Sequence, residues 1–399
     1  VLGPFKSDPF DSRMVISPLN TVPKKDSQAR RMVVDLSFPP GLSVNDAIPK
    51  NQYLGVEYKL TLPTVDDLVC IIKQLGMGCL LFKRDLRRAY RQIPVDPRDV
   101  YLLGYHVEGH LYCDAVLPMG LRTSCLACQR VTSAVTYMFC QKGRKLVNYI
   151  DDLAGADVGE QAFVAFQELG DLLQNLGLEE SVDKACSPST KMCFLGIEFD
   201  TVQGTLTIPP QKLQEVKQLL VKWEGKDTAT KQELQSLAGS LNFLSACIRP
   251  GRIFMSRILN TLRSMGHQHT IVLSQEFKMD IFWWKCFAPE YNGISLMPLA
   301  DWSAPDEVVS SDACLDGCGG YSEGKYFHAP FPDFIRKQSL HINALELLGL
   351  IVSLKLWGKC WKGLRIKMNC DNLTAVTVLN TGRAKDPLLQ ACLREVCYL

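Results

Sequence analysis

Two apolar runs in the first half of the chain lead directly into carboxylates. Residues 146–150 (LVNYI) are of types that β-strands favour, and Asp151 and Asp152 follow them. Residues 80–84 (LLFKR) lead in the same way to Asp85. The pattern predicts a hairpin with Asp151 and Asp152 at its tip and another strand that ends at Asp85. One interpretation of the hairpin tip is a simple turn, because Asp is a common turn residue; the other is a divalent-cation site that offsets carboxylate repulsion.

The pattern changes along the rest of the chain. Residues 1–205 mix short strand-like runs with helical spacing and many Pro and Gly residues, which predicts an α+β region. After a Pro-Pro pair, the apolar spacing predicts amphipathic helices at 211–223 and 231–246. The second helix follows a capping-box pattern that joins Thr230 to Glu233. Together these helices predict an all-α module.

The C-terminal part has a pattern of its own. Residues 267–306 are less regular and carry an aromatic patch, so we interpret them as a connection. From Val308 onward, strand-like runs alternate with Gly-rich turns. A helix, a strand and a helix are then expected at 344–357, 364–370 and 373–379. The predicted order of this part is therefore βββαβα.

Composition limits the possible classes of protein. A chain of 399 residues that is 47% hydrophobic can bury sizeable cores and is expected to form more than one domain. The net charge of +2 means that nucleic-acid binding would depend on local basic patches. Sixteen scattered cysteines, with no signal peptide, indicate reduced thiols in an intracellular protein of the cytoplasm or nucleus that is not secreted. No apolar run is long enough to span a bilayer, so no membrane partner is expected.

Cys125 and Cys128 form a C-x-x-C pair, but no second pair or nearby His completes a zinc set, so packing is the favoured interpretation. The chain begins at Val1 and not at Met, which indicates a segment of a longer protein.

The carboxylates of the first half are expected to meet. If the strand that ends at Asp85 pairs beside the hairpin, Asp85, Asp151 and Asp152 converge. Two Mg²⁺ ions about 3.5 to 4 Å apart would stabilise such a group and would clamp the attacking and leaving oxygens of a phosphoryl displacement. Basic residues surround Asp85, and a cationic loop at 23–31 leads into a strand. These basic residues are either phosphate contacts or a solvated face.

Five ordered motifs carry a resemblance to a known family. They are YIDD at 149–152, FKRDLRRAYRQIPV at 82–95, LPMGLRTS at 117–124, GLEESVDK at 177–184 and FLGIEFD at 194–200. With them the chain resembles the reverse transcriptases of retroelements, followed by an RNase H-like domain. The segments GPF, ISPL, VPKKD and DLSFPPGLSVNDAI look most like DIRS-type, tyrosine-recombinase retrotransposons.

The resemblance implies roles for individual residues. Asp85, Asp151 and Asp152 would be the metal ligands, with a backbone carbonyl from Leu86, and would bind two Mg²⁺ ions. Lys184 would protonate the departing pyrophosphate, or would be a surface lysine. The residues implied in binding the deoxynucleoside triphosphate (dNTP) are Lys24 and Arg31 at the triphosphate, Tyr90 as the aromatic gate under the sugar, and Met119.

The resemblance also covers the C-terminal part. Asp312, Glu346 and Asp371 match the acidic residues of RNase H-like domains, where they could bind two further Mg²⁺ ions. Each has a simpler interpretation: Glu346 is spaced to cap a helix with Asn343, and Asp371 with its neighbour could start one. The fourth acidic residue of the family would lie beyond Leu399, so RNase H activity in this segment is uncertain.

The implied architecture is an α+β right-hand polymerase (fingers, palm, thumb) followed by an α/β RNase H-like domain truncated at its C-terminus. Its boundaries are expected at 1–205 for interleaved fingers and palm, 206–266 for the thumb, 267–306 for the connection and 307–399 for the RNase H-like domain.

The implied function is RNA-directed DNA synthesis for a retrotransposon. Its partners would be an RNA template, a DNA primer, an RNA–DNA hybrid and other domains of the same polyprotein. Departures from the family's motifs, at Met119, Cys125, Cys128 and Arg88, leave an alternative open. In that alternative, the chain is a degenerate or domesticated copy that binds primer–template without catalysis.

Overall fold

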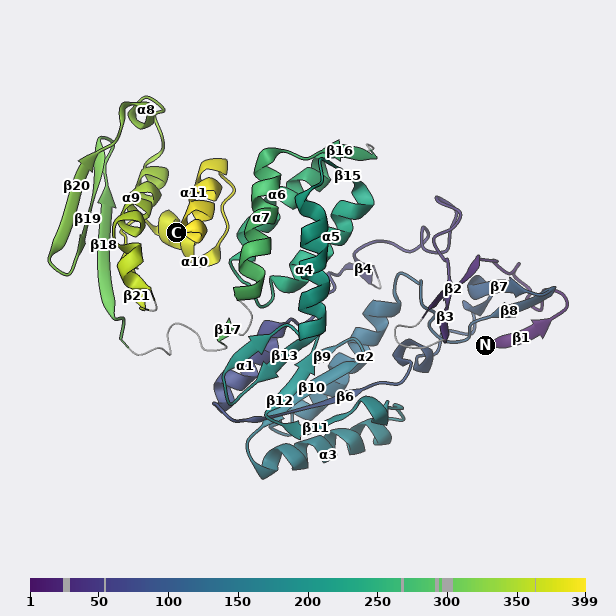
Figure 1. Cartoon of the computed structure of the whole chain (residues 1–399). Coiled ribbons are helices and arrows are strands. Elements are labelled where there is room, and N and C mark those ends of the chain that lie inside the picture. The colour runs from purple at the N-terminus through teal and green to yellow at the C-terminus, as the bar shows by residue number, and fades with distance from the viewer. Residues whose placement is uncertain (24–28, 54, 267–268, 291–293, 296–303, 363) are drawn as a thin grey trace. The chain divides into compact units, whose positions relative to one another are not determined.

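The computed structural model describes residues 1–23, 29–53, 55–266, 269–290, 294–295, 304–362 and 364–399 (Figure 1). Lys24 lies outside the described residues. The chain divides into two compact units: unit 1 holds Val1–Leu195 and Phe199–Gly204, and unit 2 holds Gly196–Glu198 and Thr205–Leu399. Among the helices described, none has both the length and the apolar character needed to cross a membrane.

The main sheet of unit 1 has the strand order β11-β6-β10-β9. Its strands are β6 (Leu80–Asp85), β9 (Leu146–Tyr149), β10 (Asp152–Asp157) and β11 (Cys186–Ser189). All three neighbouring pairs are antiparallel. The helices α2 (Ser124–Cys140) and α3 (Glu160–Asn175) share one core with β6, β9 and β10, which includes the fully buried Phe82, Phe139 and Leu153. Gly155 permits this packing, because a Cβ there would lie 2.5 Å from the Phe82 ring.

Shorter elements complete unit 1. A three-stranded sheet has the order β1-β8-β7, and β2 pairs with β3 and β4 with β5. Their bounds are β1 Leu2–Phe5, β2 Leu19–Pro23, β3 Arg30–Val34, β4 Gln52–Tyr53, β5 Val56–Glu57, β7 Gly104–Val107 and β8 His110–Cys113. The other elements are α1 Val65–Leu75, the 3₁₀ helices η1 Ala89–Gln92, η2 Val100–Leu103 and η3 Val182–Lys184, and the strand β12 Lys191–Phe194. The strand β13 (Ile197–Asp200) has residues in both units.

The first part of unit 2 is helical, as predicted. Its helices are α4 (Pro210–Glu224), α5 (Lys231–Leu244), α6 (Gly251–Ser264) and α7 (Gln275–Glu290). The capping box is confirmed: Thr230 Oγ1 accepts from Glu233 N at 3.2 Å, and Thr230 N donates to Glu233 Oε2 at 2.9 Å. Between the helices, β15 (Thr228–Thr230) pairs with β16 (Thr270–Val272). The strand β14 (Thr205–Thr207), which precedes α4, pairs with β17 (Ile294–Ser295), which follows α7.

The expectation of an irregular connection at 267–306 is wrong for α7. This helix of 16 residues buries Trp283 and Trp284, which are at most 1% exposed. The two rings contact each other edge to face, and Trp283 also stacks on Phe254 with ring centroids 3.9 Å apart. Adjacent large aromatics obscure the helical spacing of apolar positions, because the core surrounds more than one face of the helix.

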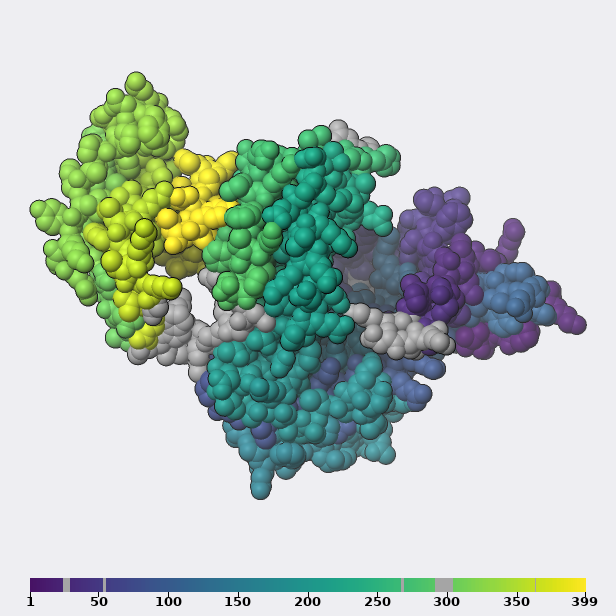
Figure 2. All heavy atoms as spheres, viewed as in Figure 1, coloured from purple at the N-terminus to yellow at the C-terminus, as the bar shows by residue number. Residues whose placement is uncertain are grey.

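The second part of unit 2 confirms the predicted βββαβα order. Its sheet has the order β20-β19-β18-β21, with β21 parallel to β18. The elements are β18 Glu307–Ala313, β19 Gly317–Ser322, β20 Lys325–Pro330, α8 Asp333–Arg336, α9 Ile342–Trp357, η5 Gly358–Trp361, β21 Ile366–Asn369, α10 Leu373–Thr381 and α11 Pro387–Tyr398. The C-terminal residues, yellow in Figure 2, include α11, whose Arg394 Nε lies 3.2 Å from Asp280 Oδ1 of α7.

Candidate active site

The predicted hairpin tip is confirmed and is tightly held. Ile150 begins the turn between β9 and β10 with a φ of 53°, a left-handed conformation that a β-branched residue rarely adopts. Gln129 of α2 compensates for it: its Oε1 accepts from Ile150 N at 2.7 Å, and its Nε2 donates to Asn148 O at 3.0 Å. Gln129 was not predicted as a site residue. Its only signal in the sequence was a polar amide on a helix face that is otherwise buried.

The backbone brings Asp85 to the hairpin tip, as predicted. Asp152 is the direct partner of Asp85 in the antiparallel register of β6 and β10. Leu86 N donates to Asp151 O at 2.9 Å, which joins the residue after the strand to the turn. Because directly opposed residues of a sheet face the same side, the Asp85 and Asp152 side chains share one face. Sequence positions about 66 residues apart therefore form one acidic site.

Two lysines partly balance this negative charge. Lys184 Nζ donates to Asp85 Oδ1 at 2.8 Å, and Lys83 Nζ lies 3.4 Å from Asp152 Oδ1. Burial raises the pKa of Asp151 and of Asp152, and the nearby Asp85 raises both further. The hydrogen bond to Asp85 raises the pKa of Lys184, so this lysine stays charged at neutral pH. The site thus holds more carboxylates than it holds cations.

The donor set fits a hard divalent cation. Asp85, Asp151 and Asp152 offer only oxygen ligands, which Mg²⁺ prefers. Asp152 Oδ1 is buried, and its ion-pair partner among the described residues, Lys83 Nζ, lies 3.4 Å away. A buried carboxylate oxygen with only one distant cationic partner is costly, and a bound metal ion would lower that cost. Unlike the cluster of unit 2 described below, these three carboxylates do not place ligand atoms that all lie within 4.8 Å of one another.

A cleft of about 1270 Å³ opens beside these carboxylates. Among the predicted residues, Arg31, Leu86, Tyr90, Met119, Asp151 and Lys184 all line it. Seven further arginines or acidic residues line the cleft without having been assigned to the nucleotide, namely Arg30, Arg87, Arg88, Arg91, Asp114, Glu180 and Asp183. This lining is rich in cationic side chains, as a site for a triphosphate requires.

Two side chains shape the floor of the cleft. Tyr90 is half-buried, and burial together with Cys125 and Cys128 raises the pKa of its phenol, so it remains neutral. Arg91 Nη1 lies 2.7 Å from Oδ1 of Asp114, a carboxylate that is 1% exposed. This ion pair could not be predicted from the sequence, because Arg91 lies in η1 and Asp114, 23 residues later, follows the end of β8.

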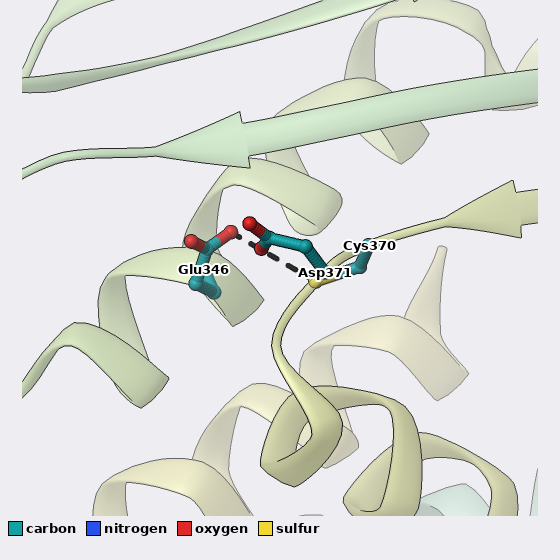
Figure 3. A group of neighbouring side chains, drawn as sticks. All are labelled: Glu346, Cys370 and Asp371. Carbon is teal, nitrogen blue, oxygen red and sulfur yellow. Dashed lines mark hydrogen bonds between the residues drawn. The ribbon is translucent and has the colours of Figure 1, made fainter.

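A second cluster lies in unit 2 (Figure 3). Glu346 of α9, Cys370 after β21 and Asp371 place their donor atoms within 4.8 Å of one another. Cys370 Sγ donates to Glu346 Oε2 at 3.8 Å. Burial raises the pKa of Glu346, and Asp312 and Asp371 raise it further. The three predicted carboxylates are therefore close enough to influence one another, although Asp312 is outside the tight group.

The simpler interpretations of these acidic residues are partly wrong. His341 caps α9, with its Nδ1 accepting from Asn343 N at 3.2 Å, and Glu346 lies inside the helix with 4% of its surface exposed. Asn372 does cap α10 by accepting from Ala375 N at 3.0 Å, which leaves Asp371 just outside that helix. Glu346 and Asp371 are thus not helix caps. Cys370 was not predicted as part of the cluster.

Comparison with known proteins finds a family match for the first part of the chain. Residues 22–199 match the family described as reverse transcriptase (RNA-dependent DNA polymerase). No curated protein matches the chain in sequence.

The solved structures that resemble the chain include foamy viral protease–reverse transcriptases. The dRH form in complex with double-stranded DNA is 16% identical with a TM-score of 0.57, and the match covers 97% of this chain and 64% of that one. Another complex with double-stranded DNA is 15% identical with a TM-score of 0.57, covering 98% of this chain and 76% of that one. A complex with an RNA/DNA hybrid is 15% identical with a TM-score of 0.53, and the match covers 97% of this chain and 50% of that one. These likenesses show a reverse transcriptase polymerase fold, and this chain spans about two thirds or less of two of those proteins.

Proposed function

We propose that this chain is an RNA-directed DNA polymerase, which extends a DNA primer on an RNA template, because residues 22–199 match the reverse transcriptase family. The observation that carries the proposal is the register that opposes Asp85 and Asp152 directly beside Asp151 at the hairpin tip. A metal-dependent nucleotidyl transfer needs carboxylates in this arrangement next to a cleft that accepts a triphosphate.

The proposed reaction joins the primer 3′-oxygen to the α-phosphorus of a dNTP and breaks the bond to pyrophosphate. The primer hydroxyl gives its proton to solvent water, and the Lys184 ammonium gives a proton to the departing pyrophosphate. Lys184 suits this role because its Nζ is charged and lies at the site, 2.8 Å from Asp85 Oδ1. Catalysis then rests on positioning and charge neutralisation more than on covalent chemistry of the protein.

Asp85, Asp151 and Asp152, with the carbonyl of Leu86, would hold two Mg²⁺ ions. Bound Mg²⁺ would supply positive charge for the triphosphate and for the attacking oxygen. Arg31 would contact the triphosphate from β3, with Lys24 nearby in sequence, and a guanidinium can form two parallel hydrogen bonds to phosphate. Tyr90 would place its ring under the sugar and exclude a 2′-hydroxyl, and Met119 would contact the nucleotide.

We further propose that residues 307–399 form an RNase H-like domain that acts on RNA–DNA hybrids. The βββαβα order supports this assignment, as do the neighbouring Glu346 and Asp371 and the influence of Asp312 on the pKa of Glu346. Two further Mg²⁺ ions would bind there. The complexes of the foamy viral enzymes with double-stranded DNA and an RNA/DNA hybrid support nucleic-acid partners for this chain.

The origin of the chain remains a proposal on sequence grounds. The motifs of the first half favour a DIRS-type retrotransposon, in which other domains of the same polyprotein would be partners. No disulfide joins the cysteines of the described residues, which favours an intracellular setting, the cytoplasm or the nucleus.

The test is primer extension. The chain is incubated with poly(rA), oligo(dT), dTTP and Mg²⁺, beside the Asp151→Asn variant, and binding of the primer–template is measured separately by fluorescence anisotropy. Extension by the natural sequence alone supports the proposal. Binding without extension supports the non-catalytic alternative, and equal extension by both proteins removes Asp151 from the mechanism.

A further inference from the structure

Arg84 is buried in the strand that delivers Asp85. Its side chain is 8% exposed and faces away from the acidic site, because successive residues of a strand point to opposite sides. The guanidinium packs against helix α3. Arg84 Nε donates to Phe166 O at 3.0 Å, and Arg84 Cζ lies 3.9 Å from the centroid of the Phe166 ring. A Cβ at Gly170 would lie 2.6 Å from Arg84 Nη2, so a glycine there leaves room for the arginine.

The charge of Arg84 is matched by Glu180. Arg84 Nη1 donates to both carboxylate oxygens of Glu180 at 2.6 Å, and the Glu180 side chain is 21% exposed. A buried ion pair depends on both partners, since removal of either leaves an uncompensated charge. The pair therefore fixes where residue 180 lies relative to β6.

From Glu180 the chain leads directly to the catalytic groups. Ser181 N donates to Asp85 O at 2.7 Å, so the residue after Glu180 is bonded to the backbone of a catalytic aspartate. The 3₁₀ helix η3 follows and ends at Lys184, whose Nζ contacts Asp85 Oδ1 at 2.8 Å. Lys184 is 57% exposed, so little packing holds its side chain. Its placement depends on the segment that carries it.

We propose that Arg84 and Glu180 form a positioning pair, which places Lys184 against Asp85 from the opposite face of strand β6. The inference rests on the proposed function, in which Lys184 gives a proton to pyrophosphate. In this role both members act through Lys184; Arg84 is buried away from the cleft, and Glu180, at the edge of the cleft, is engaged by Arg84 through both of its carboxylate oxygens. Misplacement of a reacting group by about 1 Å can lower a rate about 100-fold, so a pair outside the acidic site can matter for the rate.

A double-mutant cycle tests the proposal. Single-nucleotide incorporation is measured for Glu180→Gln, Lys184→Met and the double variant. Glu180→Gln is expected to lower kcat by about 10- to 100-fold with little change in the KM for dNTP, and to add nothing when Lys184 is already replaced. An equal loss in both backgrounds, or a higher KM with unchanged kcat, would overturn the proposal.

Two further variants sharpen the test. Glu179→Gln is the matched control, because Glu179 is the adjacent residue and its ion pair with Arg87 is 61% and 55% exposed on the two sides; extension is expected to be unchanged. Gly170→Ala adds a methyl group on α3 that would clash with the Arg84 guanidinium. This variant is expected to lower kcat, as Glu180→Gln does. A kcat for Gly170→Ala equal to that of the natural sequence would argue against the proposal.

A readout that does not need catalysis separates this inference from the proposed function. Acetylation of Lys184 by an N-hydroxysuccinimide ester is followed by mass spectrometry, with circular dichroism as the check on folding. Glu180→Gln is expected to raise the labelling rate several-fold toward that of Asp85→Asn, whereas Glu179→Gln leaves it unchanged. Unchanged labelling in Glu180→Gln sinks the positioning role, while a chain that labels as expected but does not extend primers sinks only the proposed function.

Discussion

The two acidic clusters of the chain handle their charge differently. In unit 1, Asp85 and Asp152 each have a lysine near one oxygen, at 2.8 Å and 3.4 Å. In unit 2, the groups that act on Glu346 are two other carboxylates, a backbone amide and the Cys370 thiol, with no Lys or Arg among those of the described residues. The lysines therefore partly neutralise the first cluster. In the second cluster, the negative charge is reduced mainly by protonation of Glu346 or by an added cation.

The largest expected effect tests whether primer extension depends on the cluster of unit 1 and hybrid cleavage on the cluster of unit 2. Asp85→Asn is expected to lower primer extension by about 1000-fold or more, because it removes both a proposed metal ligand and the partner of Lys184. Any hybrid cleavage should be unaffected by this change, whereas Glu346→Gln should leave extension unaffected and remove cleavage. Both activities are measured on the same preparations with labelled primer and labelled RNA. Parallel loss of both activities in either variant would mean that the clusters are not independent sites.

The sequence predicted the local features of these sites because local chemistry determines them. The hairpin tip at Asp151, the strand that ends at Asp85 and the capping box at Thr230 each depend on a few neighbouring residues. Their spacing along the chain was enough to indicate secondary structure and the acidic residues.

The missed features depend on tertiary structure. Gln129 supports Ile150 from another element, Arg84 meets Glu180 across 96 positions, and Cys370 meets Glu346 across 24. Taken alone, each residue has an ordinary structural interpretation. Gln129 could be any polar helix residue, Arg84 any charged strand residue and Cys370 any small buried thiol. A pair of distant residues carries no signal in a single sequence until the fold brings the two together.

Addition of Mg²⁺ should stabilise unit 1 in a pH-dependent way. The folded-state pKa values of Asp151 and Asp152 are raised, so their contribution to stability is fully present below the unfolded value near 3.8 and is lost as the pH rises through the folded values. At pH 7.5 a bound cation offsets that loss, by about 2.7 kcal/mol at a free concentration 100 times its Kd. Thermal unfolding with and without Mg²⁺ measures this gain.

The matched control is Asp151→Asn, which should reduce the gain at pH 7.5. At pH 3.5, where the carboxylates are protonated, the gain should disappear in the natural sequence as well. A Mg²⁺ effect of the same size at both pH values would show that the ion acts elsewhere.

Tyr90 should make the cleft of unit 1 select deoxyribonucleotides over ribonucleotides, a selectivity that is not expected of the cluster in unit 2. Tyr90→Ala is expected to relax discrimination against ribonucleotides by about 10- to 100-fold, because loss of the ring makes room for a 2′-hydroxyl. Tyr90→Phe keeps the ring and should keep the discrimination. Incorporation kinetics with dTTP and UTP give the ratio, and an unchanged ratio in Tyr90→Ala would remove Tyr90 from the sugar site.

The smallest expected effect tests the difference in charge balance between the two acidic clusters. It is a change in the free energy of unfolding, measured without metal ions. Glu346→Gln should raise the free energy of unfolding by on the order of 1 kcal/mol at pH 7.5, because an amide avoids the burial cost and the repulsion from Asp312 and Asp371. Asp152→Asn should gain less, because the natural Asp152 already has Lys83 at 3.4 Å. The folded pKa of Glu346 is raised, so the gain should shrink as the pH falls through that pKa and the natural carboxylate takes up a proton. Denaturant unfolding in EDTA measures both variants, and a larger gain for Asp152→Asn would mean that the lysines of unit 1 do not balance its carboxylates.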